Sequence, residues 1–465
     1  MRLINAATLQ LERFDDDTRI PPYAILSHTW AAEEVTLQHF EDAYTGDETT
    51  GTRIRLMLGY AKILKACYQT LQDSYAYVWV DTCCIDKTSS AELSEAINSM
   101  FRWYENAQVC YAYLEDIEAH ATEDPNIYQS EASAVFDTPL KTAKWFTRGW
   151  TLQEMIASTQ LKFYSSDWTF LGTKETLLEE LTNITKVDRL GLTDFRPEHF
   201  SVAQRMSWAA NRRTVRTEDI AYSLMGIFDV NMPLLYGEGE KAFARLQEAI
   251  LNSSEDQSLF AWSPSIRTDM PPGKGTFFFA QHPREFVASR GILHTLPSGG
   301  EPTALTSKGI RINLPIQKIK NSKSDLANEA PLFLAVLYCI YKEKPDHLPA
   351  IVLRRSQTEA DTDTDTQAYV RHESVSAQAG AHAGCGQGDT KDLLFQAAQV
   401  ENAAATLQAA SPNSEQGTDM IAHVYSSNYW NRNRDTRARI SSFETADLCS
   451  QLPFHSYNNL NSVYE

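Results

Sequence analysis

Short apolar runs alternate with helical patterns along the first part of the chain. Residues 23–26, 75–80 and 109–114 are rich in β-branched and aromatic side chains and have the length of buried strands. Between them, apolar residues recur at the three- and four-residue spacing of a helix, at Ile54, Met57, Leu58, Ala61, Leu64, Tyr68 and Leu71, and at Leu93, Ala96, Ile97, Met100, Phe101 and Tyr104. This alternation predicts an α/β fold with a parallel sheet and right-handed crossovers.

The pattern continues beyond the third run and then becomes mainly helical. Residues 161–164 fit a further strand and residues 174–185 a helix, so an α/β domain is predicted over residues 1–185. Residues 186–265 are predicted to form a helical extension, with Ser201 as a plausible helix cap.

The last part of the chain, residues 275–465, is predicted to be a β-rich module. Its apolar runs are separated by Gly, Pro and charged turns and lie at residues 277–280, 310–314, 332–341 and 351–353. Residues 358–390 consist mainly of Asp, Thr, Ala, Gly, Ser and Gln, which bury too little apolar surface to order a chain. We therefore expect a disordered insert at about residues 358–390.

Composition narrows the classes of function. A net charge of -18 argues against nucleic acid or an anionic membrane as the main partner, because binding phosphates needs clustered cations. Seven cysteines, an odd number without paired spacing, fit a reducing compartment. The first 14 residues lack a signal peptide, and no apolar run approaches the roughly 20 residues that span a bilayer. We expect a cytoplasmic protein without a membrane span.

Polar residues gather where the predicted strands end. In a parallel sheet the carboxyl ends of the strands face the ligand crevice, and here these ends carry Ser27, His28, Asp81, Glu115 and Asp116. For any one of them alone, a capping or turn role is the simpler interpretation. Together they predict a cleft rich in carboxylates, with no set of residues at metal-ligand spacing.

Two tryptophans and a glutamate add to this edge. Trp150 and Glu154 lie four residues apart in a predicted helix, so they share one helix face. Such a pair is more often a core anchor beside a solvated charge. With Trp30 nearby, however, the cleft suits a flat cationic ring more than a phosphate, because ring stacking and carboxylate attraction both favour the cation.

Three other groups of residues were weighed for chemistry. Cys83 and Cys84 allow a thiol-nucleophile hypothesis, but adjacent cysteines lack the spacer of metal or redox motifs, and packing is the simpler role. The arginines at 205, 212, 213 and 216 are predicted to lie on a solvated, salt-bridged helix surface rather than to hold a phosphate. Residues 237–241 lack the spacing of a phosphate-binding loop.

Long motifs in a fixed order identify a family resemblance. They are YAILSHTW at 23–30, WVDTCCIDK at 79–87 and RGWTLQE at 148–154, followed by further matching segments at 218–229, 234–243 and 258–262. In these motifs the chain resembles the heterokaryon-incompatibility (HET) domain proteins of filamentous fungi. The resemblance covers roughly residues 1–262 and reaches the β-rich tail only loosely.

The resemblance implies a role in fungal nonself recognition. In this family, engagement of the domain triggers programmed cell death when incompatible hyphae fuse. Many members join the domain to a nucleotide-binding switch and a repeat sensor, which are not recognised in these residues. The sensor is therefore expected to be the tail or a partner protein.

The HET domain is also similar to the Toll/interleukin-1 receptor (TIR) domain, which implies a TIR-like or flavodoxin-like fold. Several TIR domains hydrolyse NAD with one glutamate that follows a tryptophan by four residues, and this motif falls on Trp150 and Glu154. The resemblance implies that Glu154 is catalytic, that Ser27, Trp30, Asp81 and Trp150 line the pocket, and that NAD is a substrate rather than a bound cofactor. One carboxylate suffices, because nicotinamide leaves as a neutral molecule and needs no acid.

Two hypotheses from different classes therefore stand after the sequence. The first is an NAD glycohydrolase that acts as a cell-death effector. The second is a non-enzymatic signalling adaptor that works by self-association through the HET domain. An aromatic residue and an acid on one helix would serve either of them.

Overall fold

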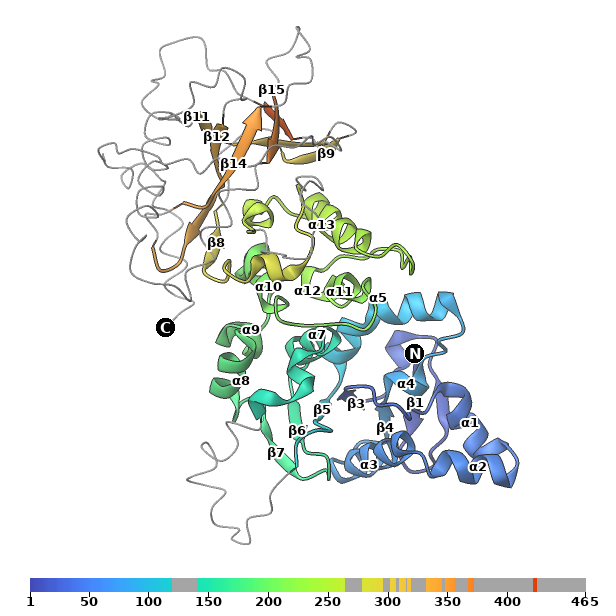
Figure 1. Ribbon diagram of the computed structural model, residues 1–465. Helices are drawn as coiled ribbons and strands as arrows, with labels where there is room; N and C mark the ends of the chain where they lie inside the picture. Colours follow the sequence, from blue (N-terminus) through green and yellow to red (C-terminus); the bar gives the residue numbers. More distant parts are fainter. Residues whose placement is uncertain are drawn as a thin grey trace. The chain divides into compact units, whose positions relative to one another are not determined.

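The computed structural model describes ten stretches of the chain, namely residues 1–118, 140–263, 278–295, 302–306, 309–314, 316–318, 332–344, 348–355, 367–371 and 421–424. The chain divides into two compact units, Met1–His199 with Asn211–Leu246, and Phe200–Ala210 with Gln247–Glu465 (Figure 1). The three segments predicted from the sequence are a different division and stay a prediction.

The first unit is built on a seven-stranded sheet in the order β2-β1-β4-β3-β5-β6-β7. Its centre is parallel and consists of β4 (Tyr77–Trp79), β3 (Tyr23–His28), β5 (Val109–Tyr113) and β6 (Leu161–Tyr164). Every residue of β3 is buried, as expected for a strand with neighbours on both sides and helices above and below. The predicted α/β class with a mostly parallel sheet is confirmed.

Antiparallel strands that the sequence did not predict complete the edges of this sheet. They are β1 (Arg2–Asn5), β2 (Leu11–Arg13) and β7 (Phe170–Thr173). All three are three or four residues long and at least partly exposed. Such short strands show too little alternation to be recognised from a pattern.

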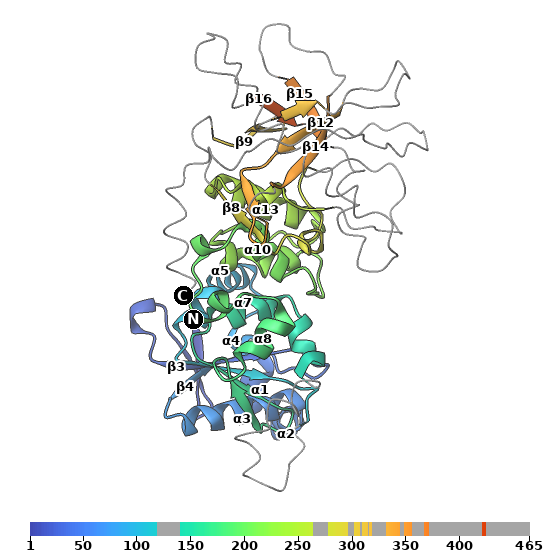
Figure 2. The same cartoon turned by 90° about the vertical axis from the view of Figure 1, so that its left-hand side faces the viewer.

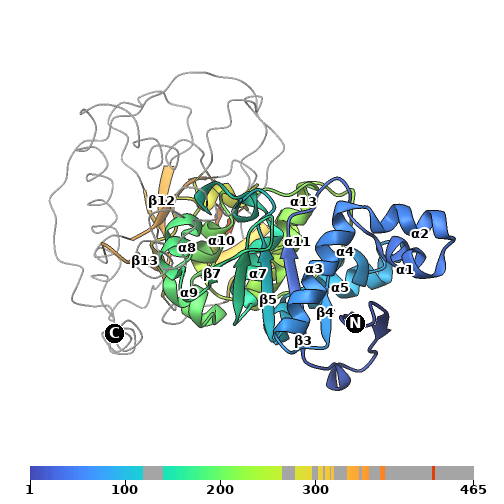
Figure 3. The same cartoon turned by 90° about the horizontal axis from the view of Figure 1, so that it is seen from below.

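Helices cover both faces of the sheet. Helix α3 (Leu58–Gln72) lies on one face, and α5 (Ser90–Asn106) and α7 (Trp150–Ala157) lie on the other (Figure 2; Figure 3). This arrangement follows from right-handed crossovers, because the connection from β3 to β4 runs in one direction along the sheet and those from β4 to β5 and from β5 to β6 run in the other. The other helices of the unit are α1 (Leu37–Thr45), α2 (Glu48–Arg55), α4 (Asp81–Cys84), α8 (Leu178–Thr185), α9 (Arg189–Thr193), α11 (Asp219–Tyr222) and α12 (Met225–Phe228).

The helical pattern predicted over residues 54–71 is present in the structure, with changes. The pattern over residues 54–71 belongs to α2 and α3, which are separated at Leu56 and Met57. Helix α3 also buries Tyr60, Ile63, Ala66 and Cys67 rather than most of the apolar residues that predicted it.

A carboxylate holds the glycine-containing loop before α13 (Lys241–Ser253). Glu218 accepts hydrogen bonds from the backbone N–H groups of Gly237, at 2.8 Å, and Gly239, at 3.0 Å. Both glycines have positive φ, +103° and +63°, which side chains disfavour. The N–H groups that a phosphate loop would offer to a ligand are therefore taken up by the protein itself.

The second unit contains α10 (Val202–Trp208) and two β-sheets. Ser201 and Gln204 form a reciprocal capping box at the start of α10, which confirms the predicted cap. The larger sheet has the order β11-β12-β14-β15-β16-β10-β9, and β13 pairs with β8. Their bounds are β8 (Ile292–His294), β9 (Ala304–Thr306), β10 (Gly309–Asn313), β11 (Ile316–Lys318), β12 (Leu332–Val336), β13 (Cys339–Tyr341), β14 (Ala350–Arg355), β15 (Gln367–Arg371) and β16 (Ile421–Val424).

The β-rich character of the tail is confirmed, but two predicted strands differ. The run 332–341 is two strands, and the described residues 278–280 form none. Of the predicted disordered insert, 358–390, the structure describes only Gln367–Arg371, which pairs with β14. These five residues correct the prediction, because Tyr369 and Val370 favour a strand. The rest of the insert lies outside the described residues.

Candidate active site

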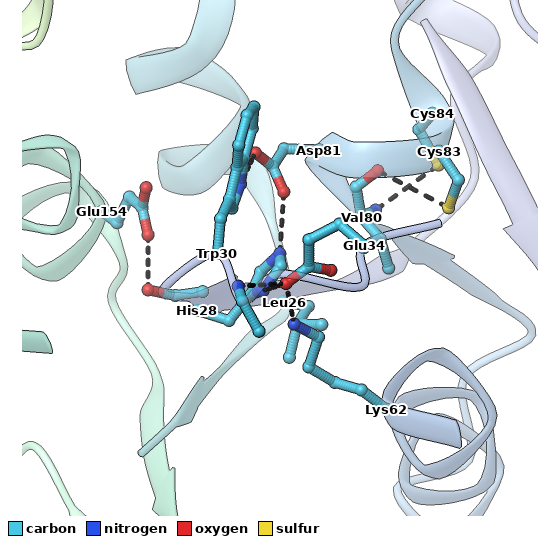
Figure 4. Close-up of polar contacts among 12 residues, drawn as sticks. Leu26, His28, Trp30, Glu34, Lys62, Val80, Asp81, Cys83, Cys84 and Glu154 are labelled. Atoms are coloured by element: carbon cyan, nitrogen blue, oxygen red, sulfur yellow. Dashed lines mark hydrogen bonds and ion pairs between the residues drawn. The ribbon is translucent and has the colours of Figure 1, made fainter. Parts of the chain in front are cut away.

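The carboxyl ends of the parallel strands bring the predicted site residues to one edge. Ser27 and His28 end β3, and Asp81 follows β4 and opens α4. Glu154 reaches the same edge from α7, which contacts β3 (Figure 4). Rows of backbone bonds fix the strands in register, so the positions of these side chains follow from the fold rather than from a flexible loop.

Glu154 is held by a chain of hydrogen bonds that starts at Trp145. The indole N–H of Trp145 donates to Ser27 Oγ at 2.8 Å, and the Ser27 hydroxyl in turn donates to Glu154 Oε2. All three residues are buried. Because Ser27 already accepts the indole proton, its own proton is directed to the carboxyl group.

Burial sets the charge state of Glu154. The pKa of this carboxyl is raised to about 8, mainly by burial and also by the negative charge of Asp81, against the hydrogen bonds of Ser27 and Tyr104 and the charge of Arg148. At neutral pH the free protein therefore holds Glu154 mainly in its protonated form. Negative charge at this position appears only as the pH approaches 8 or when a cation enters.

Asp81 lies at the same edge of the sheet, but its surroundings favour the charged form of its carboxyl group. Burial alone would raise the pKa of this carboxyl, but the charge of Lys87 and the bonds from His28 and Trp30 outweigh burial and lower the pKa. His28 Nε2 lies 2.9 Å from Oδ1, and Trp30 Nε1 donates to Oδ2 at 2.8 Å. Since an ionised carboxylate only accepts, Nε2 carries the proton. Asp81 is therefore the charged carboxylate of the site.

Glu34 and Lys62 form a second group of charges, on the Nδ1 side of His28. Glu34 Oε1 lies 3.7 Å from His28 Nδ1 and 2.5 Å from Lys62 Nζ. The His28 side chain is almost wholly buried, and that of Asp81 is 20% exposed. The imidazole is thus fixed between two carboxylates and orients Asp81 toward the accessible side.

Trp30 is the most exposed member of the site, with 48% of its surface accessible. The ammonium of Lys87 lies 3.6 Å from the centre of its ring, which is a cation–π contact. The sequence predicted a ligand cation against this aromatic group, and the structure places a cation of the protein there.

Trp150 does not join this group. It opens α7 in a half-buried position, and its indole is hydrogen-bonded to Asp219. The structure therefore links Ser27 to Glu154 and Trp30 to Asp81, while Trp150 points to another carboxylate. Trp145, five residues earlier, provides the indole next to Glu154. The sequence pointed to Trp150, because only this tryptophan lies one helical turn before Glu154, and spacing gave no signal for Trp145.

The structure also decides two of the remaining sequence hypotheses. Cys83 and Cys84 are buried, and burial raises the pKa of the Cys83 thiol well above its usual value, so the packing role is confirmed. The predicted solvated arginine surface is wrong for Arg205 and Arg212, which are buried. Arg212 donates to the backbone oxygen of Arg148 and to Thr151 Oγ1, at 2.8 and 2.9 Å. These two bonds replace hydrogen bonds that an exposed guanidinium would make to water.

Neither a metal site nor a membrane helix is found in the described ranges. No group of His, Cys, Asp and Glu side chains there is arranged to hold a metal ion. In the same residues, no helix has the length and apolar character that crossing a bilayer requires.

Comparison with known proteins adds two matches to family models and one relative. Residues 23–154 match the model described as heterokaryon incompatibility protein (HET), and residues 241–289 match a domain of unknown function, DUF8212. Vegetative incompatibility protein HET-E-1 of Podospora anserina is 44% identical over 233 residues, which are 50% of this chain and 16% of that protein. The chain thus spans about a sixth of the length of this relative. No solved structure matches this chain.

Proposed function

We propose that this chain, which carries a HET domain over residues 23–154, is a fungal vegetative-incompatibility protein. The observation that carries this proposal is the 44% identity with a protein that bears that name. The aligned stretch covers 233 residues, more than the 132 residues of the HET match alone. The proposal includes a cytoplasmic location, the triggering of programmed cell death, and a trigger supplied by a partner sensor or by the tail.

We further propose that the domain kills by cleaving NAD at Glu154, as TIR-type enzymes do. What supports this is a buried carboxyl that Ser27 holds at the carboxyl edge of the sheet, next to a separate, ionised Asp81. When the surroundings push the pKa values of two carboxyl groups in one site apart, the two groups can have different roles in catalysis. Packing of the sheet edge alone does not require this difference in protonation state between Glu154 and Asp81.

In the proposed reaction, the bond between nicotinamide and the ribose C1′ breaks. The bonding electron pair stays with nicotinamide, which leaves as a neutral pyridine, and the ribose becomes cationic. The positive charge near Glu154 favours its ionised form, so the carboxyl proton passes to solvent, and the carboxylate then stabilises the oxocarbenium-like transition state. Water adds at C1′ and its proton passes to solvent, which gives ADP-ribose.

Asp81 and Trp30 are proposed to receive the pyridinium ring before the bond breaks. The carboxylate attracts the cation, and the indole offers a ring face for stacking. Ser27 keeps Glu154 in place through the hydroxyl, while Trp150 supports α7 from outside this arrangement.

Replacing the charge of Asp81 tests its role in binding. Asp81→Asn keeps an oxygen for one of the two donors but removes the negative charge, so we expect KM for NAD to rise about tenfold or more, with a smaller change in kcat. Initial rates of nicotinamide release over a range of NAD concentrations measure both constants. An unchanged KM would contradict the role proposed for Asp81.

The function itself is tested in two settings. Purified protein at high concentration should release nicotinamide from NAD, and its expression in a fungal host should lower cellular NAD before the cells die. A host that dies with normal NAD, together with purified protein that releases no nicotinamide, would reject the enzyme. The self-associating adaptor would then be the function that remains.

A further inference from the structure

Helix α3 exposes an apolar stripe to solvent. The exposed fractions are 71% for Leu58, 37% for Leu64, 65% for Tyr68 and 43% for Leu71. The helix packs on the sheet through its opposite face, with Ile63, Ala66 and Cys67 among the buried residues. Large apolar side chains gathered along one exposed helix face indicate an interaction surface rather than chance exposure.

The spacing of the stripe is that of a helix–helix seam. Met57, Ala61, Leu64, Tyr68 and Leu71 follow one another in steps of four, three, four and three residues. This is the repeat in which each apolar side chain enters a gap on a facing helix. The kind of partner that the stripe fits is therefore another helix.

The order of side-chain sizes along the stripe is complementary to itself. When two copies of α3 run antiparallel about an axis between Leu64 and Lys65, Leu58 lies at the level of Leu71 and the small Ala61 faces the large Tyr68. Alternation of large and small residues across a seam fills space without a void. A twofold axis repeats each of these contacts, as symmetric dimers require.

We propose that α3 pairs antiparallel with α3 of a second copy of this chain. The proposal rests on self-association through the HET domain, which is the second hypothesis from the sequence, and assigns a surface to it. It is independent of the chemistry at Glu154, since none of the stripe residues lies in that site.

The pairing is expected to be weak and dependent on concentration. Helix α3 has 15 residues, a length of about 22 Å, which buries less than the roughly 800 Å² per partner of a stable complex. The net charge of -18 on each copy opposes association, and the exposed Lys65 approaches its symmetry mate near the axis. Added salt should therefore strengthen the dimer by screening both repulsions.

Sedimentation velocity over a range of protein concentrations tests the surface. The wild-type chain should shift from monomer toward dimer as its concentration rises. Leu58→Glu and Tyr68→Glu should stay monomeric and keep the melting temperature, because both side chains are already exposed. Val215→Glu, at a position 80% exposed outside α3, is the matched control and should associate like wild type.

A charge exchange tests whether α3 faces itself. A mixture of wild type with Lys65→Glu should form more mixed dimer than either protein forms alone, because the lysine of one copy then meets the carboxylate of the other. Preference for unmixed pairs would overturn the antiparallel pairing. Dimers that survive Leu58→Glu and Tyr68→Glu would overturn the α3 surface and leave self-association standing. A monomer at every concentration would overturn both.

Discussion

Glu154→Gln is expected to lower the turnover of NAD by about 100-fold or more, the usual loss when one preorganised electrostatic group is removed from a site. Glutamine has nearly the shape of glutamate, and its amide can still accept the hydrogen bond of the Ser27 hydroxyl. What disappears is the negative charge that can form next to the reacting ribose. Nicotinamide release by the two purified proteins measures the loss, and Glu41→Gln, an exposed glutamate on α1, is the control.

The pH profile gives the same hypothesis a sharper test. Burial raises the pKa of Glu154 to about 8, and kcat/KM reports the ionisation of the free enzyme. If the ionised carboxylate stabilises the transition state, kcat/KM should rise about tenfold per pH unit below 8 and level off above it. A profile that falls above pH 8 would show that the protonated acid is required, and the proposed role of Glu154 would be wrong.

Stability should change in the opposite direction over the same pH range. The pKa of Glu154 is higher in the folded chain than in the unfolded one, so the folded state binds more protons between the ordinary glutamate value and about 8. Stability is then complete below the unfolded pKa and is lost as the pH rises through 8. Glu154→Gln removes this loss, and its melting temperature should exceed that of wild type increasingly toward pH 8. Equal curves for the two proteins would indicate that Glu154 is solvated in the folded chain.

The sequence predicted the centre of the fold because that centre is strongly patterned. Strands β3 and β5 contain uninterrupted apolar runs, and only Lys162 interrupts β6; residues at their carboxyl ends must lie close together in a parallel sheet. This reasoning placed Ser27, Asp81 and Glu154 at one edge, where the structure has them. The assignment of their roles stays a prediction.

Features that depend on side-chain direction or on weak patterns were not predictable. Residues 150 and 154 share a helix face by spacing, yet the indole of Trp150 turns to Asp219 while Trp145 reaches Ser27. Periodicity likewise marked an apolar face of α3 without indicating whether the sheet or solvent would cover it. The contact of Lys87 with Trp30 had no signal in spacing, because α1, α2, α3, β4 and α4 separate the two residues along the chain.

Trp145→Ala is expected to destabilise the chain by roughly 3–5 kcal/mol, the range for truncating a buried aromatic side chain. The indole is 1% exposed and meets Phe146 and Phe163 edge to face, with ring centres 5.1 and 5.6 Å apart. Its loss leaves a cavity beneath the site and removes the donor that fixes the Ser27 hydroxyl.

Two further variants separate packing from hydrogen bonding at this position. Trp145→Phe retains most of the ring but not the N–H, so it should cost about 1–2 kcal/mol, mainly from the lost bond to Ser27. Trp150→Ala, at a half-buried position, should cost less than Trp145→Ala. The midpoint of urea unfolding, compared at an unchanged slope of free energy against urea concentration, measures the loss of stability in all three variants. If Trp145→Ala unfolds at the same midpoint as wild type, the indole does not anchor this region, and the ordered chain from Trp145 through Ser27 to Glu154 cannot be what positions the carboxyl group.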